Sequence, residues 1–174
     1  MVNLVESLVG ERARKKGLYF RRQALAILKK SDKVATNFVI RTSYSGNAKT
    51  LTVDAKQARK DYVDNIKNLD FTLAPKGDGN FSVRFFESLS LGRIPLLIDT
   101  DCPLPLEEEI GYDDFILRVS HKDLPHIADR VAAYYSSLTP EDFIEKQKKC
   151  REVFEKYLKI DVFFRQVLTQ EYLL

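Results

Sequence analysis

The sequence has few of the residues that mark several other classes of protein. Its only cysteines, Cys102 and Cys150, lack C-x-x-C spacing, and His121 and His126 form no convincing metal cluster with them. We therefore expect no bound metal and two free thiols, as in a reducing compartment. Glycine and proline are scarce, with 7 and 6 residues, whereas phenylalanine and tyrosine number 11 and 8. This composition argues against a disordered or low-complexity chain.

Long hydrophobic segments are also missing from the chain. We find no signal peptide and no apolar run long enough to span a bilayer, so we expect a cytoplasmic protein. A length of 174 residues, 44% of them hydrophobic, fits one domain with a sizeable core. We place that core at about residues 2–138 and expect helices over about 139–174.

Positive charge is concentrated near the N-terminus. Residues 1–60 hold 14 Lys and Arg against 4 Asp and Glu, whereas the remainder holds 14 against 21. A basic end indicates a phosphate-bearing partner, either a nucleotide or a nucleic acid, although a solvated helix face explains it equally well. The basic segment 12–33 lacks stacking aromatics, and no RRM, KH or zinc-finger motif accompanies it, so we expect no nucleic-acid partner.

Short apolar runs alternate with helical stripes along the chain. The runs predict strands at residues 2–9, 37–40, 70–74, 94–98 and 115–117. The stripes predict helices through residues 20–28, 54–66, 82–91 and 124–135, from Thr139, and from Asp161 to the end. This alternation is typical of an α/β fold with a doubly wound, mainly parallel sheet and helices on both faces.

Ligands of such sheets bind outside the carboxyl ends of the strands. That rule selects the loops 10–16, 41–46, 76–80 and 99–105, and with them Gly10 and Arg41. In residues 71–101 a strand leads through a glycine turn into a helix, and free N–H groups at a helix start favour an anion. Arg84 in the first turn of this helix is suited to bind a phosphate. Glu87, one helical turn further on, is suited to accept hydrogen bonds from ribose hydroxyls. A plain surface ion pair between the two is the alternative.

The run S-x-R-x-x-E-x-L-x-x-G-x-I-P, which begins at Ser82, resembles the exostosin family of glycosyltransferases. The preceding F-x-L-x-P-x-G, which begins at Phe71, belongs to the same pattern, and the likeness extends more loosely over residues 5–135 to include Gly10 and Arg41. The resemblance implies the C-terminal, nucleotide-sugar-binding half of a GT-B enzyme, with a UDP-sugar donor, a saccharide acceptor and no required metal.

The resemblance also implies roles for individual residues. Arg84 would contact the diphosphate and Glu87 the ribose. Ser82 and the backbone from Gly77 to Asn80 would line the phosphate, and Lys76 is either a phosphate contact or a solvated turn residue. The N-terminal acceptor domain is absent from this chain, so we expect it as a separate domain or partner chain. A Golgi-lumenal location applies if the chain is a fragment of a eukaryotic membrane-anchored enzyme.

Three alternatives stay open. Asp99-Thr100-Asp101 after an apolar strand matches the D-x-D motif with which GT-A glycosyltransferases hold a metal. A nucleic-acid-binding domain and a degenerate domain that only pairs with a catalytic chain are the others. The apolar residues of 162–174 exceed what one buried helix face accommodates, so we expect part of that surface to be exposed and to promote association.

Overall fold

In the computed structural model, residues 17–40, 54–77 and 79–171 are described. Three parallel strands form the sheet in the order β1 (Phe71–Ala74), β2 (Ile94–Asp99) and β3 (Leu117–Ser120). Leu96 at the centre of β2 pairs in register with Leu73 of β1 and Leu117 of β3. The parallel arrangement follows from the connections, because α5 (Val83–Ser90) carries the chain from the end of β1 back to the start of β2.

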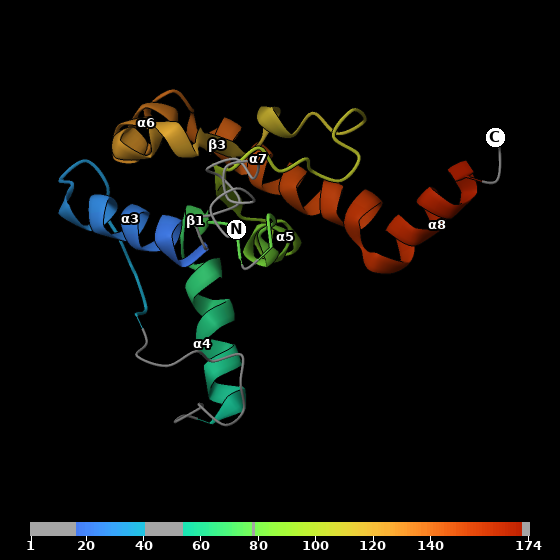
Figure 1. Cartoon of the computed structure of the whole chain (residues 1–174), viewed down its shortest axis with the longest axis horizontal. Coiled ribbons are helices and arrows are strands. Elements are labelled where there is room, and N and C mark those ends of the chain that lie inside the picture. The colour runs from blue at the N-terminus through green and yellow to red at the C-terminus, as the bar shows by residue number, and fades with distance from the viewer. Residues whose placement is uncertain (1–16, 41–53, 78, 172–174) are drawn as a thin grey trace, which may run out of the picture.

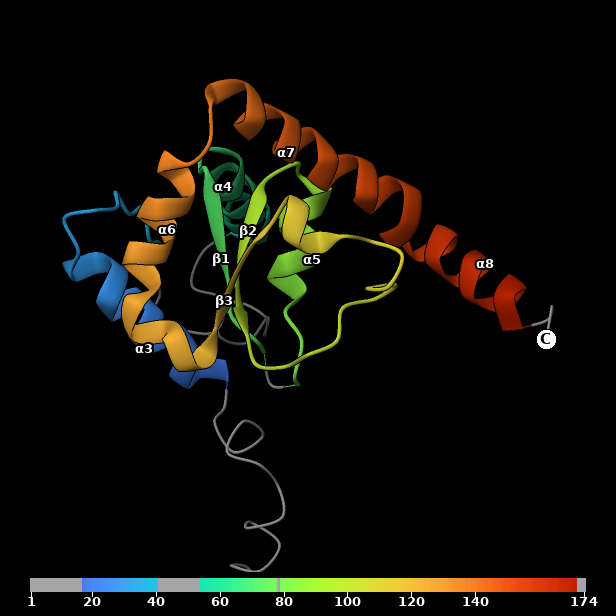
Figure 2. The ribbon, with the colours of Figure 1, turned by 90° about the horizontal axis from the view of Figure 1, so that it is seen from above.

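Helices cover both faces of this sheet (Figure 2). α5 and α7 (Pro140–Val153) pack on one face, where Phe85, Leu89 and Cys150 are buried with Leu97 of β2. The other face is covered by α3 (Gly17–Lys30), the 3-10 turn η3 (His121–His126) and α6 (Ile127–Ser136). Each large apolar side chain buried in these two clusters stabilises the fold by about 1.5–3 kcal/mol.

Local capping signals set the helix boundaries as the sequence predicts. The Asp54 carboxylate accepts a hydrogen bond from the Gln57 N–H at 2.9 Å and begins α4 (Ala55–Lys67). Thr139 and Asp142 form a reciprocal capping box around Pro140 at the start of α7. Gly92 has a φ of +62° and closes α5, with its N–H bonded to the Leu89 carbonyl.

Two of the predicted strands need correction. Residues 37–40 form no strand, and Val39 and Ile40 are 59% and 68% exposed; among the described residues, no strand pairs with them. The third strand begins at Leu117 rather than Phe115, because Phe115 and Ile116 follow the short 3-10 turn η2 (Tyr112–Asp114) into the core.

Other predictions are partly tested. The fold is α/β with a parallel sheet and helices on both faces, as predicted. The reversal of strand order that defines a doubly wound sheet is not seen among the described strands, so that detail stays a prediction. The predicted strand 2–9, with Gly10 and Arg41, lies outside the described residues.

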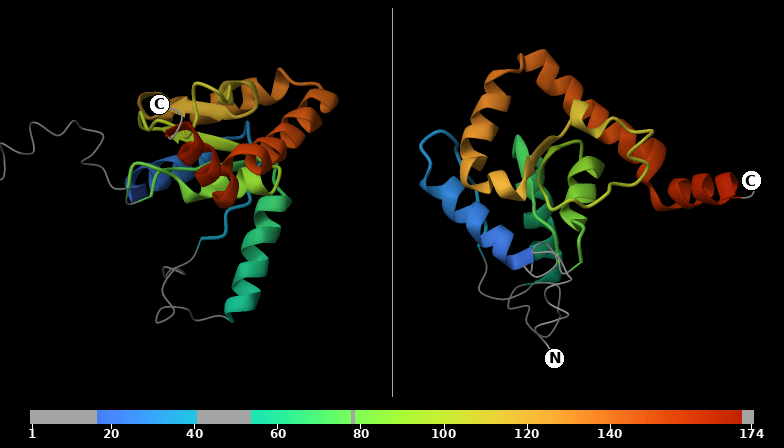
Figure 3. Two further views of the ribbon diagram at one scale, coloured as in Figure 1. Left: turned by 90° about the vertical axis from the view of Figure 1, so that its right-hand side faces the viewer. Right: turned by 45° about the horizontal axis from the view of Figure 1, so that its top comes forward.

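Two helices extend from the body of the molecule. Figure 1 shows α4 projecting away from the sheet, and Figure 3 shows α8 (Ile160–Glu171) leading away from the end of α7 through the π-helical turn η4 (Phe154–Leu158). Phe164 and Leu168 are 54% and 49% exposed, which confirms the expected exposed apolar surface on the described part of 162–174; Ile160 beside them is 75% exposed. No helix in the described ranges is long and apolar enough to cross a membrane.

Candidate functional site

The carboxyl ends of β1 and β2 carry two loops that lie against each other. After β1, a turn from Pro75 to Phe81 is closed by the Gly77 N–H, which donates to the Phe81 carbonyl at 2.8 Å. After β2 comes the loop 99–105. The Asn80 amide joins them: its nitrogen donates to the Thr100 carbonyl at 3.3 Å, and its oxygen accepts from the Thr100 hydroxyl at 2.6 Å. Thr100 is buried, so this pair locks the two loops together.

A pocket of about 240 Å³ opens between these loops and the start of α5. Its floor and walls are largely apolar, from Phe81, Phe85, Phe86, Leu97, Ile98 and Leu104. Among its polar lining groups are Lys76, Asn80, Ser82, Asp99 and Thr100. A mainly apolar pocket with a few converging polar groups at the carboxyl edge of a parallel sheet is the usual form of a small-molecule site.

Lys76 and Ser82 are buried at the rim of this pocket, not solvated. The Lys76 side chain is 5% exposed, and its ammonium lies 5.7 Å from the centre of the Phe20 ring on α3. Ser82 is the N-cap residue of α5, yet its hydroxyl makes no capping hydrogen bond. The pocket therefore combines a buried cation with the start of a helix, and both favour a negatively charged ligand group.

Glycine at position 17 lets α3 approach the β1 turn closely. A Cβ there would lie 2.1 Å from the Lys76 carbonyl oxygen and 2.3 Å from that of Gly77. No side chain fits at those distances, so the start of α3 supports the backbone of the turn that holds Lys76.

Arg84 and Glu87 lie on a different side of α5, toward α4. The Arg84 Nε donates to the Tyr62 hydroxyl at 3.2 Å, and the guanidinium lies 5.1 Å from the centre of the Tyr62 ring. That hydroxyl in turn donates to Glu87 Oε2. Within the part of the chain that the structure describes, Arg84 and Glu87 do not pair directly, so the plain ion-pair alternative is wrong in its simple form.

Other groups complete this network. Arg59 of α4 lies 3.6 Å from Glu87 Oε1 in an ion pair, and its guanidinium lies 5.9 Å from the centre of the Tyr62 ring. Burial, and then the hydrogen bond to Glu87, raises the pKa of Tyr62 above its ordinary value of 10.0. The Tyr62 phenol is therefore protonated at neutral pH and available to donate.

The Asp99 carboxylate of the D-x-D run is already engaged. Asp99 Oδ1 accepts from the Asp101 N–H at 2.8 Å, and Oδ2 lies 3.8 Å from Arg118. Arg118 also pairs with Glu107 at 2.6 Å and Asp113 at 2.9 Å. The Leu104 N–H and Arg118 lower the pKa of Glu107. Across the described residues there is no group of three or more His, Cys, Asp or Glu side chains placed to hold a metal ion.

The surroundings of the two histidines and of Cys102 do not indicate a catalytic role. His121 Nδ1 lies 3.2 Å from the Asp99 carbonyl oxygen, and His126 is exposed on η3. Cys102 lines the pocket, where burial and then the charge of Asp99 raise the pKa of its thiol. A raised pKa keeps the thiol protonated, so it is a poor nucleophile at neutral pH.

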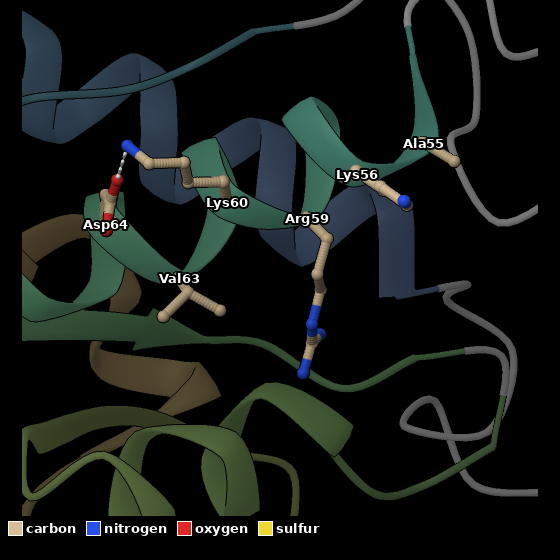
Figure 4. A pocket seen from close by; sticks show the side chains of 6 residues that line it. All are labelled: Ala55, Lys56, Arg59, Lys60, Val63 and Asp64. Carbon is tan, nitrogen blue, oxygen red and sulfur yellow. Dashed lines mark hydrogen bonds and ion pairs between the residues drawn. The ribbon is translucent and has the colours of Figure 1, made fainter.

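A second, wide-open hollow of about 520 Å³ lies along α4, between Ala55, Lys56, Arg59, Lys60, Val63 and Asp64 (Figure 4). Lys60 there pairs with Asp64 at 2.9 Å, while Arg59 extends in another direction and reaches Glu87. Two of its three basic side chains are thus engaged by neighbouring acids, and we assign no ligand to this hollow.

The structure brings together most of the predicted site residues in two adjoining places. Lys76, Asn80 and Ser82 line the pocket, beside the turn closed by Gly77, whereas Arg84 and Glu87 lie on the α4 side of α5. Tyr62 is not among the predicted site residues, and its contacts with Arg84 and Glu87 join residues 22 and 25 positions apart in the sequence.

These features define a parallel α/β domain with a ligand pocket at the carboxyl edge of its sheet. A family model for the exostosin GT47 domain matches residues 6–134, more than half of the chain. The chain therefore belongs to the exostosin GT47 family of glycosyltransferases.

Curated relatives share this segment at moderate identity. The chain is 31% identical over 87 residues to a probable β-1,4-xylosyltransferase of Arabidopsis thaliana, an alignment of 50% of this chain and 20% of the relative. A probable glucuronosyltransferase of Oryza sativa subsp. japonica is 29% identical over 87 residues, 50% of this chain and 19% of its own length. The exostosin-1 homolog of Caenorhabditis elegans is 28% identical over 101 residues, 58% and 25% of the two chains. The matched region is thus a quarter or less of these relatives.

Proposed function

We propose that this chain is the donor-binding part of a glycosyltransferase and that it binds a nucleotide-sugar, most simply a UDP-sugar, along α5. The observation that carries the proposal is the arrangement of Arg84 and Glu87, which Tyr62 holds side by side on the α4 side of α5, the helix whose N-cap residue Ser82 lines the pocket at the carboxyl edge of the sheet. A guanidinium and a carboxylate one helical turn apart match the two different polar parts of a nucleoside diphosphate.

Each residue then has a distinct role. Arg84 contacts the diphosphate through the fork of its guanidinium, and Glu87 accepts hydrogen bonds from the ribose hydroxyls. The path from Glu87 through Arg84 to Ser82 leads from the fifth residue of α5 back to its N-cap, which lines the pocket. The order ribose, then diphosphate along α5 therefore directs the phosphates toward Lys76, Asn80 and Ser82.

We propose that donor binding needs no divalent cation. The Arg118 guanidinium lies against the Asp99 carboxylate, where a cation would have to bind in a D-x-D site. Arg84 and the buried Lys76 supply positive charge for a diphosphate from side chains instead. This arrangement supports the metal-free proposal over the GT-A alternative.

Sugar transfer needs an acceptor site as well as a donor site. The chain matches a quarter or less of its relatives' lengths, so we propose that a second Rossmann-like domain, on a longer chain or a partner chain, supplies the saccharide acceptor site and the catalytic base. The exposed apolar side chains of α8 are a surface on which such a domain would pack.

A thermal-shift titration tests donor binding. A ligand that binds only the folded state adds about 2.7 kcal/mol at a hundredfold excess over its Kd, which raises the Tm of a chain this size by roughly 5–10 °C. We expect UDP to raise the Tm, with and without EDTA. If UDP, GDP and ADP all leave the Tm unchanged at millimolar concentration, the proposal is wrong. A UDP shift that disappears with EDTA would favour the metal-dependent alternative.

A further inference from the structure

Tyr62 contacts both residues to which we assign the donor, although it belongs to a different helix. Its hydroxyl accepts from Arg84 Nε at 3.2 Å and donates to Glu87 Oε2, and its ring lies under the Arg84 guanidinium at 5.1 Å. We infer that Tyr62 is a positioning residue for the donor site, which makes α4 part of that site. This inference rests on the proposed function.

The atoms that Tyr62 contacts are those that the ligand does not need. Its hydroxyl engages Nε, on the stem side of the Arg84 guanidinium. Among the described residues, neither Nη1 nor Nη2 of Arg84 has a hydrogen-bond or ion-pair partner, and these two nitrogens form the fork that binds a phosphate. On Glu87 the hydroxyl engages Oε2, and only the Arg59 ion pair at 3.6 Å approaches Oε1. Tyr62 thus orients both groups without itself occupying the Nη nitrogens of Arg84 or Oε1 of Glu87.

Without the hydroxyl between them, Arg84 and Glu87 would attract each other. Opposite charges three residues apart on a helix readily form a direct pair, and that pair would occupy the atoms needed for phosphate and ribose. A neutral phenol prevents this because it both accepts from the guanidinium and donates to the carboxylate. Its raised pKa, which follows from burial and from the bond to Glu87, preserves the donating proton at neutral pH.

The position of Tyr62 is itself fixed by α4. Asp54 caps this helix, and Ala58 and Ile66, four residues to either side of Tyr62, are buried. The three residues lie on one face of the helix, because i and i+4 positions share a face. The face of α4 that packs on the body therefore delivers the phenol to α5.

The test compares two substitutions of Tyr62 with two ligands. Tyr62→Phe removes the hydroxyl and keeps the ring, whereas Tyr62→Leu removes both. We expect Tyr62→Phe to weaken UDP by about 3- to 10-fold, and uridine less, because one hydrogen bond to each of two ligand-binding groups is lost. Tyr62→Leu should weaken UDP further, because it also removes the ring under the Arg84 guanidinium. In an Arg84→Ala background, the difference in UDP affinity between the Phe and Leu variants should shrink, and only the ring contact with Arg59, at 5.9 Å, then separates them.

Tyr135→Phe is the matched control, because Tyr135 is an exposed tyrosine on α6 whose ring contacts with Phe71 and Phe143 survive the change. It should bind both ligands as the unmodified chain does. If Arg84→Ala weakens UDP binding but neither Tyr62 variant changes it, the positioning role of Tyr62 is wrong while the proposed function is not affected. Tighter UDP binding by Tyr62→Leu would also overturn the positioning role, because Tyr62 would then compete with the ligand. Failure of the unmodified chain to bind UDP would instead overturn the proposed function on which the inference rests.

Discussion

Replacing Arg84 with alanine separates the phosphate contact from the rest of the site. The two Nη nitrogens of Arg84 lack partners among the described residues, so a diphosphate gains one or two charge-assisted hydrogen bonds there. Losing such a bond costs about 1.5–3 kcal/mol, which is a roughly 10- to 150-fold rise in the Kd for UDP. Uridine carries no phosphate, so its Kd should not change. Isothermal titration calorimetry of UDP and uridine measures both values.

The controls use the same measurement. Arg130→Ala removes the same charge from α6, where Arg130 pairs with Asp123 at 2.5 Å, and should leave both affinities unchanged. Arg84→Lys keeps the charge but not the fork and should give an intermediate Kd for UDP. Glu87→Gln should weaken UDP and uridine by similar factors, because both ligands carry the ribose. The assigned role of Arg84 is wrong if Arg84→Ala weakens uridine binding as much as UDP binding. It is also wrong if Arg84→Ala weakens UDP binding no more than Arg130→Ala does.

Three further predictions concern the structure around the site. Gly17→Ala should destabilise the chain by about 1–3 kcal/mol in urea unfolding, because the new methyl overlaps the Lys76 and Gly77 carbonyls; an increase in stability, usual for alanine in an open helix, would contradict this. Glu107 has a lowered folded-state pKa, so its contribution to stability is present above about pH 4.3 and is lost as the pH falls through the folded-state value. The difference in unfolding free energy between Glu107→Gln and the unmodified chain should therefore shrink between about pH 5 and pH 3, and a constant difference would refute it. Light scattering should show concentration-dependent association that Phe164→Glu with Leu168→Glu abolishes; a monodisperse unmodified chain at high concentration would count against the exposed α8 face as a docking surface.

The elements next to the site were predictable because their signals are local. Pro75 after β1, Gly92 after α5 and the Thr139-Pro140 pair each stop or start an element through their own backbone chemistry. The carboxyl-edge rule then selected residues 76–80 and 99–105, and the structure places the pocket between these two loops.

The features that the sequence did not predict depend on contacts between distant segments. Residues 37–40 have the apolar character of a strand, but none of the described strands pairs with them. The Tyr62 contacts with Arg84 and Glu87 require α4 to pack against α5, and no pattern within either helix encodes that packing. For the same reason, the Asn80–Thr100 bridge and the close approach of Gly17 to Lys76 became visible only in the folded chain.

A crystal structure of the chain soaked with UDP in the presence of EDTA tests the central claim most directly. The account predicts that the diphosphate lies against the Nη atoms of Arg84 and that a ribose hydroxyl donates to Glu87, with Tyr62 still between the two side chains. UDP bound elsewhere on the molecule, or bound along α5 without contact to Arg84 and Glu87, would contradict it.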